Sequence, residues 1–84
     1  MKSPKIVHIA LGSNEGERFD ILQNAVNRIF EDVGEILKIS SVYETASWGF
    51  AGNTFLNACI SVSTRFSAEE VLRKLLAIEA YFGR

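Results

Sequence analysis

Two side chains in the run NTFLNACISV, residues 53–62, have the chemistry to bind a flat ligand. In an extended strand, Phe55 and Asn57 project from the same face, because successive side chains alternate between the two faces. An aromatic ring offers a surface for stacking, and a primary amide offers both a hydrogen-bond donor and an acceptor. Together they would suit a flat heterocycle that carries both kinds of group. The alternative is structural: Phe55 caps an exposed sheet face and Asn57 is solvated.

Other residue types that often carry chemistry do not form a recognisable site in this sequence. His8 is the single histidine, and no second histidine or cysteine lies at metal-ligand spacing, so we predict a hydrogen-bonded structural residue and no metal site. Cys59 has no histidine partner at a catalytic spacing and is expected to be a small buried hydrophobe. The loop GSNEGER, residues 12–18, lacks the Gly-Lys-Ser/Thr ending of a phosphate-binding loop, which favours a tight turn.

The first half of the chain predicts a strand, a helix and a second strand. The apolar, largely β-branched run at 5–11 is typical of a strand buried on both faces. A helix is predicted over 18–33, with a stop at Gly34 and an apolar face formed by Ile21, Leu22, Ala25, Val26, Ile29 and Phe30. The β-branched segment 35–45 predicts the second strand.

The second half predicts a strand and a helix. Over 54–63, one face of the strand is expected to carry Leu56, Ala58, Ile60 and Val62. The segment SAEE, residues 67–70, is a capping box that opens a helix. We expect this helix to stop at Gly83 and to turn inward Val71, Leu72, Leu75, Ile78, Ala80 and Phe82.

The predicted order β-α-β-β-α indicates one small α+β domain over residues 1–84, with two helices on one face of an antiparallel sheet. It matches the ferredoxin-like split βαβ sandwich with its final strand missing. Hydrophobic residues make up 48% of the 84, and nine basic residues against ten acidic give a net charge of −1, which argues against nucleic acid or membrane as a partner. The single cysteine fits a reducing compartment, so we expect a cytoplasmic protein.

Five short motifs occur together in the chain: LGSN (11–14), SSVYET (40–45), WG (48–49), FLNA (55–58) and IEAYFGR (78–84). In this order and spacing, the chain resembles the N-terminal half of 6-hydroxymethyl-7,8-dihydropterin pyrophosphokinase, a family of folate biosynthesis that transfers diphosphate from ATP to a reduced pterin. The resemblance covers essentially all 84 residues.

The resemblance implies a pterin-binding set that consists of Gly12, Thr45, Ala46, Trp48, Phe55 and Asn57. Phe55 would stack on the pterin ring, and Asn57 would hydrogen-bond its edge. Glu79 and Arg84 correspond to residues near the nucleotide. Family members often have proline where this chain has Ala46, so the turn is less rigid here.

Beyond the Gly-Arg pair, the family continues into a basic loop and a strand whose Asp-x-Asp pair holds two Mg²⁺ ions. This chain has no comparable pair, so we expect no catalytic residue and no metal ligand in it. Catalysis with ATP and Mg²⁺ would need the missing half, and the chain alone is expected to be inactive.

The alternative function is a non-catalytic ferredoxin-like module for small-ligand binding or dimerisation. Without the final strand, the strand at 5–11 would be an open apolar edge, and such edges pair with other chains. We therefore expect a homodimer or a strand exchange through residues 5–11.

Overall fold

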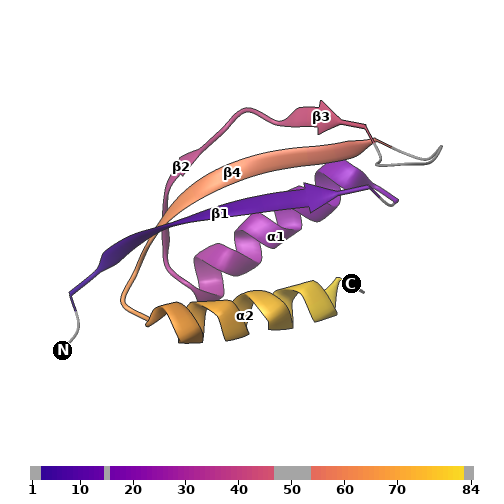
Figure 1. Cartoon of the computed structure of the whole chain (residues 1–84). Coiled ribbons are helices and arrows are strands. Elements are labelled where there is room, and N and C mark those ends of the chain that lie inside the picture. The colour runs from indigo at the N-terminus through magenta and orange to yellow at the C-terminus, as the bar shows by residue number, and fades with distance from the viewer. Residues whose placement is uncertain (1–2, 15, 47–53, 83–84) are drawn as a thin grey trace.

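Strand β4 (Phe55–Thr64) lies at the centre of the sheet in the computed structural model, which describes residues 3–14, 16–46 and 54–82. On one side β4 pairs with β1 (Lys5–Ser13), and on the other with β2 (Glu35–Ile39) and β3 (Tyr43–Thr45), always antiparallel. The helices α1 (Arg18–Asp32) and α2 (Ala68–Tyr81) lie against the same face of this sheet (Figure 1). The predicted α+β arrangement is confirmed, and it fits the ferredoxin-like pattern approximately.

The single strand predicted over 35–45 is wrong, because the structure divides it into β2 and β3. At the break, the Ser40 hydroxyl accepts a hydrogen bond from the Cys59 backbone N–H (2.8 Å) and donates one to the Ser41 carbonyl (2.9 Å). The Ser40 N–H donates to the Cys59 carbonyl at 2.8 Å. Serine side chains that bond to nearby backbone in this way compete with the regular ladder. The element order is therefore β-α-β-β-β-α.

The alternation predicted for the central strand is confirmed. Ala58, Ile60 and Val62 are buried on the side of the helices, whereas Cys59 projects from the other face and is exposed. The expectation that Cys59 is a buried hydrophobe is therefore wrong. We call the face that carries Cys59 the open face, since neither helix packs against it (Figure 1).

Strand β1 is covered on one face only, contrary to the prediction of burial on both. Ile9 is buried toward the helices, but Ile6 is 60% exposed on the open face. The reason is topological: both helices lie on the same side of the sheet (Figure 1). An apolar run alone does not reveal how many layers cover it.

The core lies between the sheet and the two helices. Ile29 of α1 packs with Ile60 and Val62 of β4, and Val71 and Ile78 of α2 complete the cluster. Each such side chain contributes roughly 1.5–3 kcal/mol through its removal from water. The cluster therefore fixes which face of β4 turns toward the helices.

Three side chains expected in this core lie outside it. Phe30 is 61% exposed, Leu72 is 57% exposed, and Ala80 is also exposed. The inward face of α2 instead follows the 4-3 spacing of Val71, Leu75 and Ile78. A residue one position away, such as Leu72, is rotated by about 100° around the helix axis.

The predicted helix boundaries within the described residues are confirmed, including the start of α1 at Arg18. The Ser67 hydroxyl accepts from the Glu70 N–H (3.1 Å), and the Glu70 carboxylate accepts from the Ser67 N–H (2.9 Å), which is the predicted capping box. Helix α1 ends at Asp32, before Gly34. A Cβ on Gly34 would lie 2.1 Å from the Ser63 carbonyl oxygen, so glycine is needed where the chain passes against β4. Gly83 lies outside the described residues. None of the described helices has the length and apolarity to cross a membrane.

Candidate functional site

Four of the predicted pterin-binding residues meet at one end of the open face. Gly12 of β1 lies directly opposite Asn57 of β4, and Thr45 of β3 lies opposite Phe55. Directly opposed residues of an antiparallel pair project from the same face. Phe55 and Asn57 precede Cys59 by four and two residues, so they project from the open face like Cys59. Both are half-buried. The sheet thus brings Gly12, Thr45, Phe55 and Asn57 together from three strands.

The protein itself fixes the Asn57 amide. Its Nδ2 donates to Thr45 Oγ1 at 2.9 Å, and it also lies 3.3 Å from the Tyr43 carbonyl and 3.4 Å from the Phe55 carbonyl. Among the described residues, no donor pairs with Asn57 Oδ1. Within the described ranges, the amide nitrogen therefore bonds to the protein itself, and the amide oxygen has no donor.

Gly12 lies close to this oxygen. A Cβ placed on Gly12 would lie 3.2 Å from Asn57 Oδ1 and 3.7 Å from Phe55 Cδ1. A side chain at position 12 would therefore crowd the amide oxygen and contact the aromatic ring. A planar group could lie over Phe55 there, with its edge at Asn57 Oδ1.

Tyr43 is a member of this cluster that the sequence analysis missed. It lies opposite Asn57 on β3 and is exposed on the same face. The Cys59 thiol raises the pKa of Tyr43 above its ordinary value of 10.0, chiefly through a side-chain hydrogen bond. The alternation along β4 places Cys59 on this face, but the position of Tyr43 depends on the register between β3 and β4, which no local sequence pattern indicates.

His8 lies farther along the open face and fulfils its predicted structural role. Its Nδ1 lies 3.0 Å from Ser61 Oγ on the paired strand. The hydrogen bond joins β1 to β4 at a distance from the Gly12 end. His8 therefore does not belong to the cluster around Asn57.

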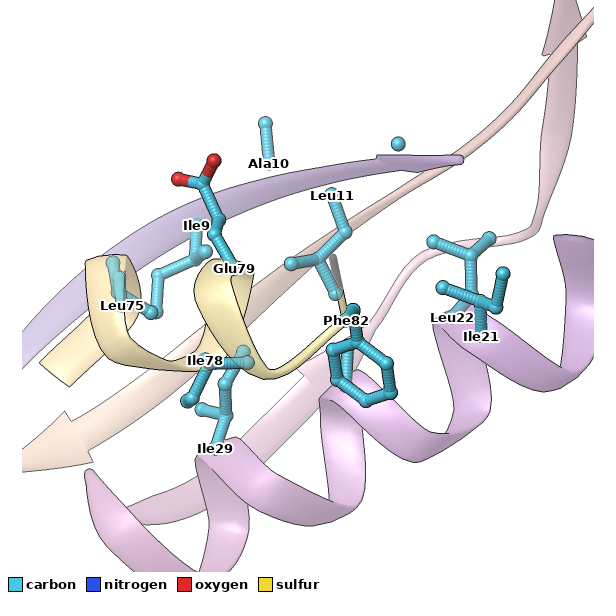
Figure 2. A pocket seen from close by; sticks show the side chains of 12 residues that line it. Ile9, Ala10, Leu11, Ile21, Leu22, Ile29, Leu75, Ile78, Glu79 and Phe82 are labelled. Carbon is cyan, nitrogen blue, oxygen red and sulfur yellow. The ribbon is translucent and has the colours of Figure 1, made fainter. Parts of the chain in front are cut away.

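The structure describes two of the four remaining predicted site residues, Ala46 and Glu79. Ala46 is exposed immediately after β3, while Trp48 and Arg84 lie outside the described residues. Glu79 is exposed on α2, on the helix side of the sheet. It borders a cavity of about 280 Å³ between β1 and the two helices, which is otherwise lined mostly by apolar side chains such as Ile9, Leu22 and Phe82 (Figure 2).

A polar cluster on the helix side of the sheet ties the same end of β3 and β4 to α1. Arg18 Nη1 donates to the Thr54 carbonyl and to Thr54 Oγ1, each at 2.7 Å, and lies 3.6 Å from Glu44 Oε2. The Thr54 hydroxyl donates to Glu44 Oε2 at 2.6 Å. This hydrogen bond, followed by the charge of Arg18, lowers the pKa of Glu44 below its ordinary value of 4.5. Residues 36 positions apart are thereby joined, which no local sequence pattern indicates.

Comparisons with known proteins identify the family of the chain. A family model described as 7,8-dihydro-6-hydroxymethylpterin-pyrophosphokinase matches residues 8–84. Relatives named 2-amino-4-hydroxy-6-hydroxymethyldihydropteridine pyrophosphokinase are 38% identical over 80 residues (Porphyromonas gingivalis), 38% over 79 (Aquifex aeolicus) and 36% over 81 (Bacillus subtilis). These matches cover 94%, 93% and 94% of this chain, but 54%, 49% and 48% of the relatives.

The chain thus spans about half the length of the curated relatives it matches. The resemblance inferred from the five short motifs is confirmed. The chain belongs to the 7,8-dihydro-6-hydroxymethylpterin-pyrophosphokinase family of folate biosynthesis.

Proposed function

We propose that this chain forms the pterin-binding half of a pyrophosphokinase that transfers diphosphate from ATP to 6-hydroxymethyl-7,8-dihydropterin. The family gives the reaction class. One observation carries the assignment of the half-site: Thr45 holds the Asn57 amide at 2.9 Å, with Asn57 Oδ1 on the side of Gly12, where a Cβ would lie 3.2 Å away.

The chemistry of a pterin fits this arrangement. A pterin is a flat, fused heterocycle whose edge carries amino and ring N–H donors. Its ring would stack on Phe55, and an N–H at its edge would donate to Asn57 Oδ1. Because Thr45 fixes the amide in advance, little side-chain entropy would be lost on binding. We assign Ala46 and Trp48 to the wall of the same pocket on the resemblance alone.

The nucleotide and the metal ions would depend on residues beyond this half-site. Diphosphate transfer requires positioning of the phosphates and neutralisation of their charge, which Mg²⁺ supplies when bound. Within the described ranges, no three His, Cys, Asp or Glu side chains are grouped so that they could hold a metal ion, and we assign no Mg²⁺ ligand there. We place Glu79 and Arg84 near the ATP. We further propose that the chain binds pterin but does not transfer diphosphate by itself.

Titration calorimetry with 6-hydroxymethylpterin tests the half-site. The wild type should bind measurably, and Asn57→Ala should weaken binding about tenfold, the equivalent of one hydrogen bond. Asn24→Ala is the matched control, because it removes the same side-chain atoms at an exposed position of α1. Circular dichroism confirms that each variant is folded.

Two results would contradict the proposal. One is the absence of binding heat with millimolar pterin, and the other is equal affinity in the Asn57→Ala and Asn24→Ala variants. The proposed inactivity has its own assay: formation of AMP from ATP in the presence of the pterin substrate. Turnover at the rate of a complete family enzyme would refute that part alone.

A second candidate function is association through β1. Within the described residues β1 pairs only with β4, and Ile6 on this strand is 60% exposed. Edge strands of this kind pair readily with another chain. We propose a homodimer or strand exchange through residues 5–11, which sedimentation velocity over a range of concentrations would test. A monomer at every concentration would exclude it.

We also propose that the protein acts in the cytoplasm. The sequence contains one cysteine, Cys59, whose thiol is exposed. A reducing compartment would preserve this thiol. Fractionation of cells that produce the protein would test the location, and recovery from an oxidising compartment would contradict it.

A further inference from the structure

We propose that Arg18 is a positioning residue for the pterin site and acts from the opposite face of the sheet. The proposal rests on the proposed function, since it explains how the same half-site keeps its shape. We define the Arg18 tie as Arg18 of α1 together with Thr54 and Glu44, the residues that it holds.

The Arg18 tie links the N-terminus of α1 to the ends of β3 and β4. A single guanidinium nitrogen reaches both the carbonyl and the hydroxyl of Thr54 at 2.7 Å, and the hydroxyl continues to Glu44 at 2.6 Å. The Arg18 side chain is 29% exposed, so water competes with these bonds only in part. Hydrogen bonds that involve charged groups are roughly twice as strong as neutral ones.

Strand alternation connects the Arg18 tie to the site. Glu44 lies between Tyr43 and Thr45, and Thr54 immediately precedes Phe55. Neighbouring strand residues project from opposite faces. The tie therefore holds the backbone directly behind the residues that cluster around Asn57, without contacting the open face itself.

Because the pairing of β3 with β4 is short, it needs support from the Arg18 tie. β3 has three residues, Tyr43–Thr45, and its pairing with β4 begins directly after Thr54. A ribbon this short is marginal on backbone hydrogen bonds alone. Yet Thr45 must stay in register with Phe55 to hold the Asn57 amide. Loss of the Arg18 tie should release β3 and, with it, the orientation of Asn57.

The decisive variants are Arg18→Gln, which removes the charge, and Arg18→Lys, which keeps it. Arg28→Gln is the matched control: Arg28 is on the same helix, pairs with Asp32 at 3.8 Å and stacks on the Tyr81 ring, away from the site. For each protein we would measure 6-hydroxymethylpterin affinity by calorimetry, thermal unfolding, and amide hydrogen exchange in β1, β3 and β4 by NMR.

Arg18→Gln should weaken pterin binding about tenfold, Arg18→Lys should recover part of this loss, and Arg28→Gln should stay within about twofold of the wild type. Arg18→Gln should also speed exchange in β3 while β1 keeps its protection. If Arg18→Gln does not fold, Thr54→Val gives a milder break, because it removes the hydroxyl and keeps the carbonyl bond. It should weaken binding about threefold.

Separate outcomes refute the two proposals. If the wild type does not bind pterin, the proposed function fails, and the role of Arg18 in that site fails with it. If the wild type binds and Arg18→Gln binds equally well, only the role of Arg18 fails. The same holds if Arg18→Gln and Arg28→Gln lose affinity in proportion to their loss of thermal stability, because Arg18 would then be purely structural.

Discussion

Gly12→Ala separates the binding site from the fold, since one methyl group should affect them very differently. In the folded chain the new Cβ would lie 3.7 Å from Phe55 Cδ1, an ordinary contact, and 3.2 Å from Asn57 Oδ1, where a small shift relieves the crowding. Replacement of glycine by alanine also stabilises a protein by about 0.4–1 kcal/mol through the unfolded chain. The free energy of unfolding should therefore change by less than about 1 kcal/mol.

Binding should suffer far more, because the methyl group occupies the strip in which the ligand edge would lie. Loss of ring stacking on an aromatic residue costs roughly 1–3 kcal/mol. We therefore expect the affinity for 6-hydroxymethylpterin to fall at least about tenfold, since 1.4 kcal/mol corresponds to a factor of ten. Titration calorimetry measures the affinity, and urea denaturation measures the stability of the same preparation.

Ala10→Ser is the control for this experiment. Ala10 is exposed two residues earlier on β1, opposite Cys59, and the change also adds one heavy atom. It should leave the affinity within about twofold of the wild type. Wild-type affinity in Gly12→Ala would refute the proposed placement of the ligand. A large loss of stability in Gly12→Ala would show instead that the glycine is structural.

Three further predictions concern the stability of the fold. Gly34→Ala should destabilise the protein by more than about 3 kcal/mol in urea denaturation, because its Cβ would lie 2.1 Å from a backbone oxygen of Ser63; wild-type stability would contradict this. Ser13→Ala should be neutral or stabilising by up to about 1 kcal/mol in the same assay, since the fully buried Ser13 hydroxyl has no hydrogen-bond partner among the described residues; a clear loss of stability would reveal one. Because folding lowers the pKa of Glu44, its contribution to stability is present above the ordinary value of 4.5 and is lost as pH falls through the folded pKa. The stability advantage of the wild type over Glu44→Gln should therefore shrink on acidification in thermal unfolding, and a constant difference would show that Glu44 does not titrate in this way.

The parts of the site that lie on one strand could be predicted from the sequence. Phe55 and Asn57 share a face because the period of a strand is two residues, and the buried Ala58, Ile60 and Val62 fix which face that is. The capping box at Ser67 was equally local, since the two residues that form it are three positions apart. In both cases the information lies within one element.

The parts that depend on several elements could not be predicted. The partner of the Asn57 amide is Thr45, and their contact requires β3 to pair with β4 in one particular register. Arg18 reaches Thr54 only because α1 begins beneath that end of the sheet. The break at Ser40 depends on a hydroxyl that bonds to the backbone of β4, a choice that strand propensity does not encode.

The register of β4 is the feature on which both the core and the site depend. A slip by one residue would move Asn57 to the helix side and would expose Ile60 to water. Two glycines lie close to β4 at its opposite ends. Gly34 leaves room for the backbone at Ser63, and Gly12 leaves room for the side chain of Asn57. The core side chains that fix this register also place Phe55 and Asn57 on the open face, so we expect both residues to be presented there wherever this chain is folded.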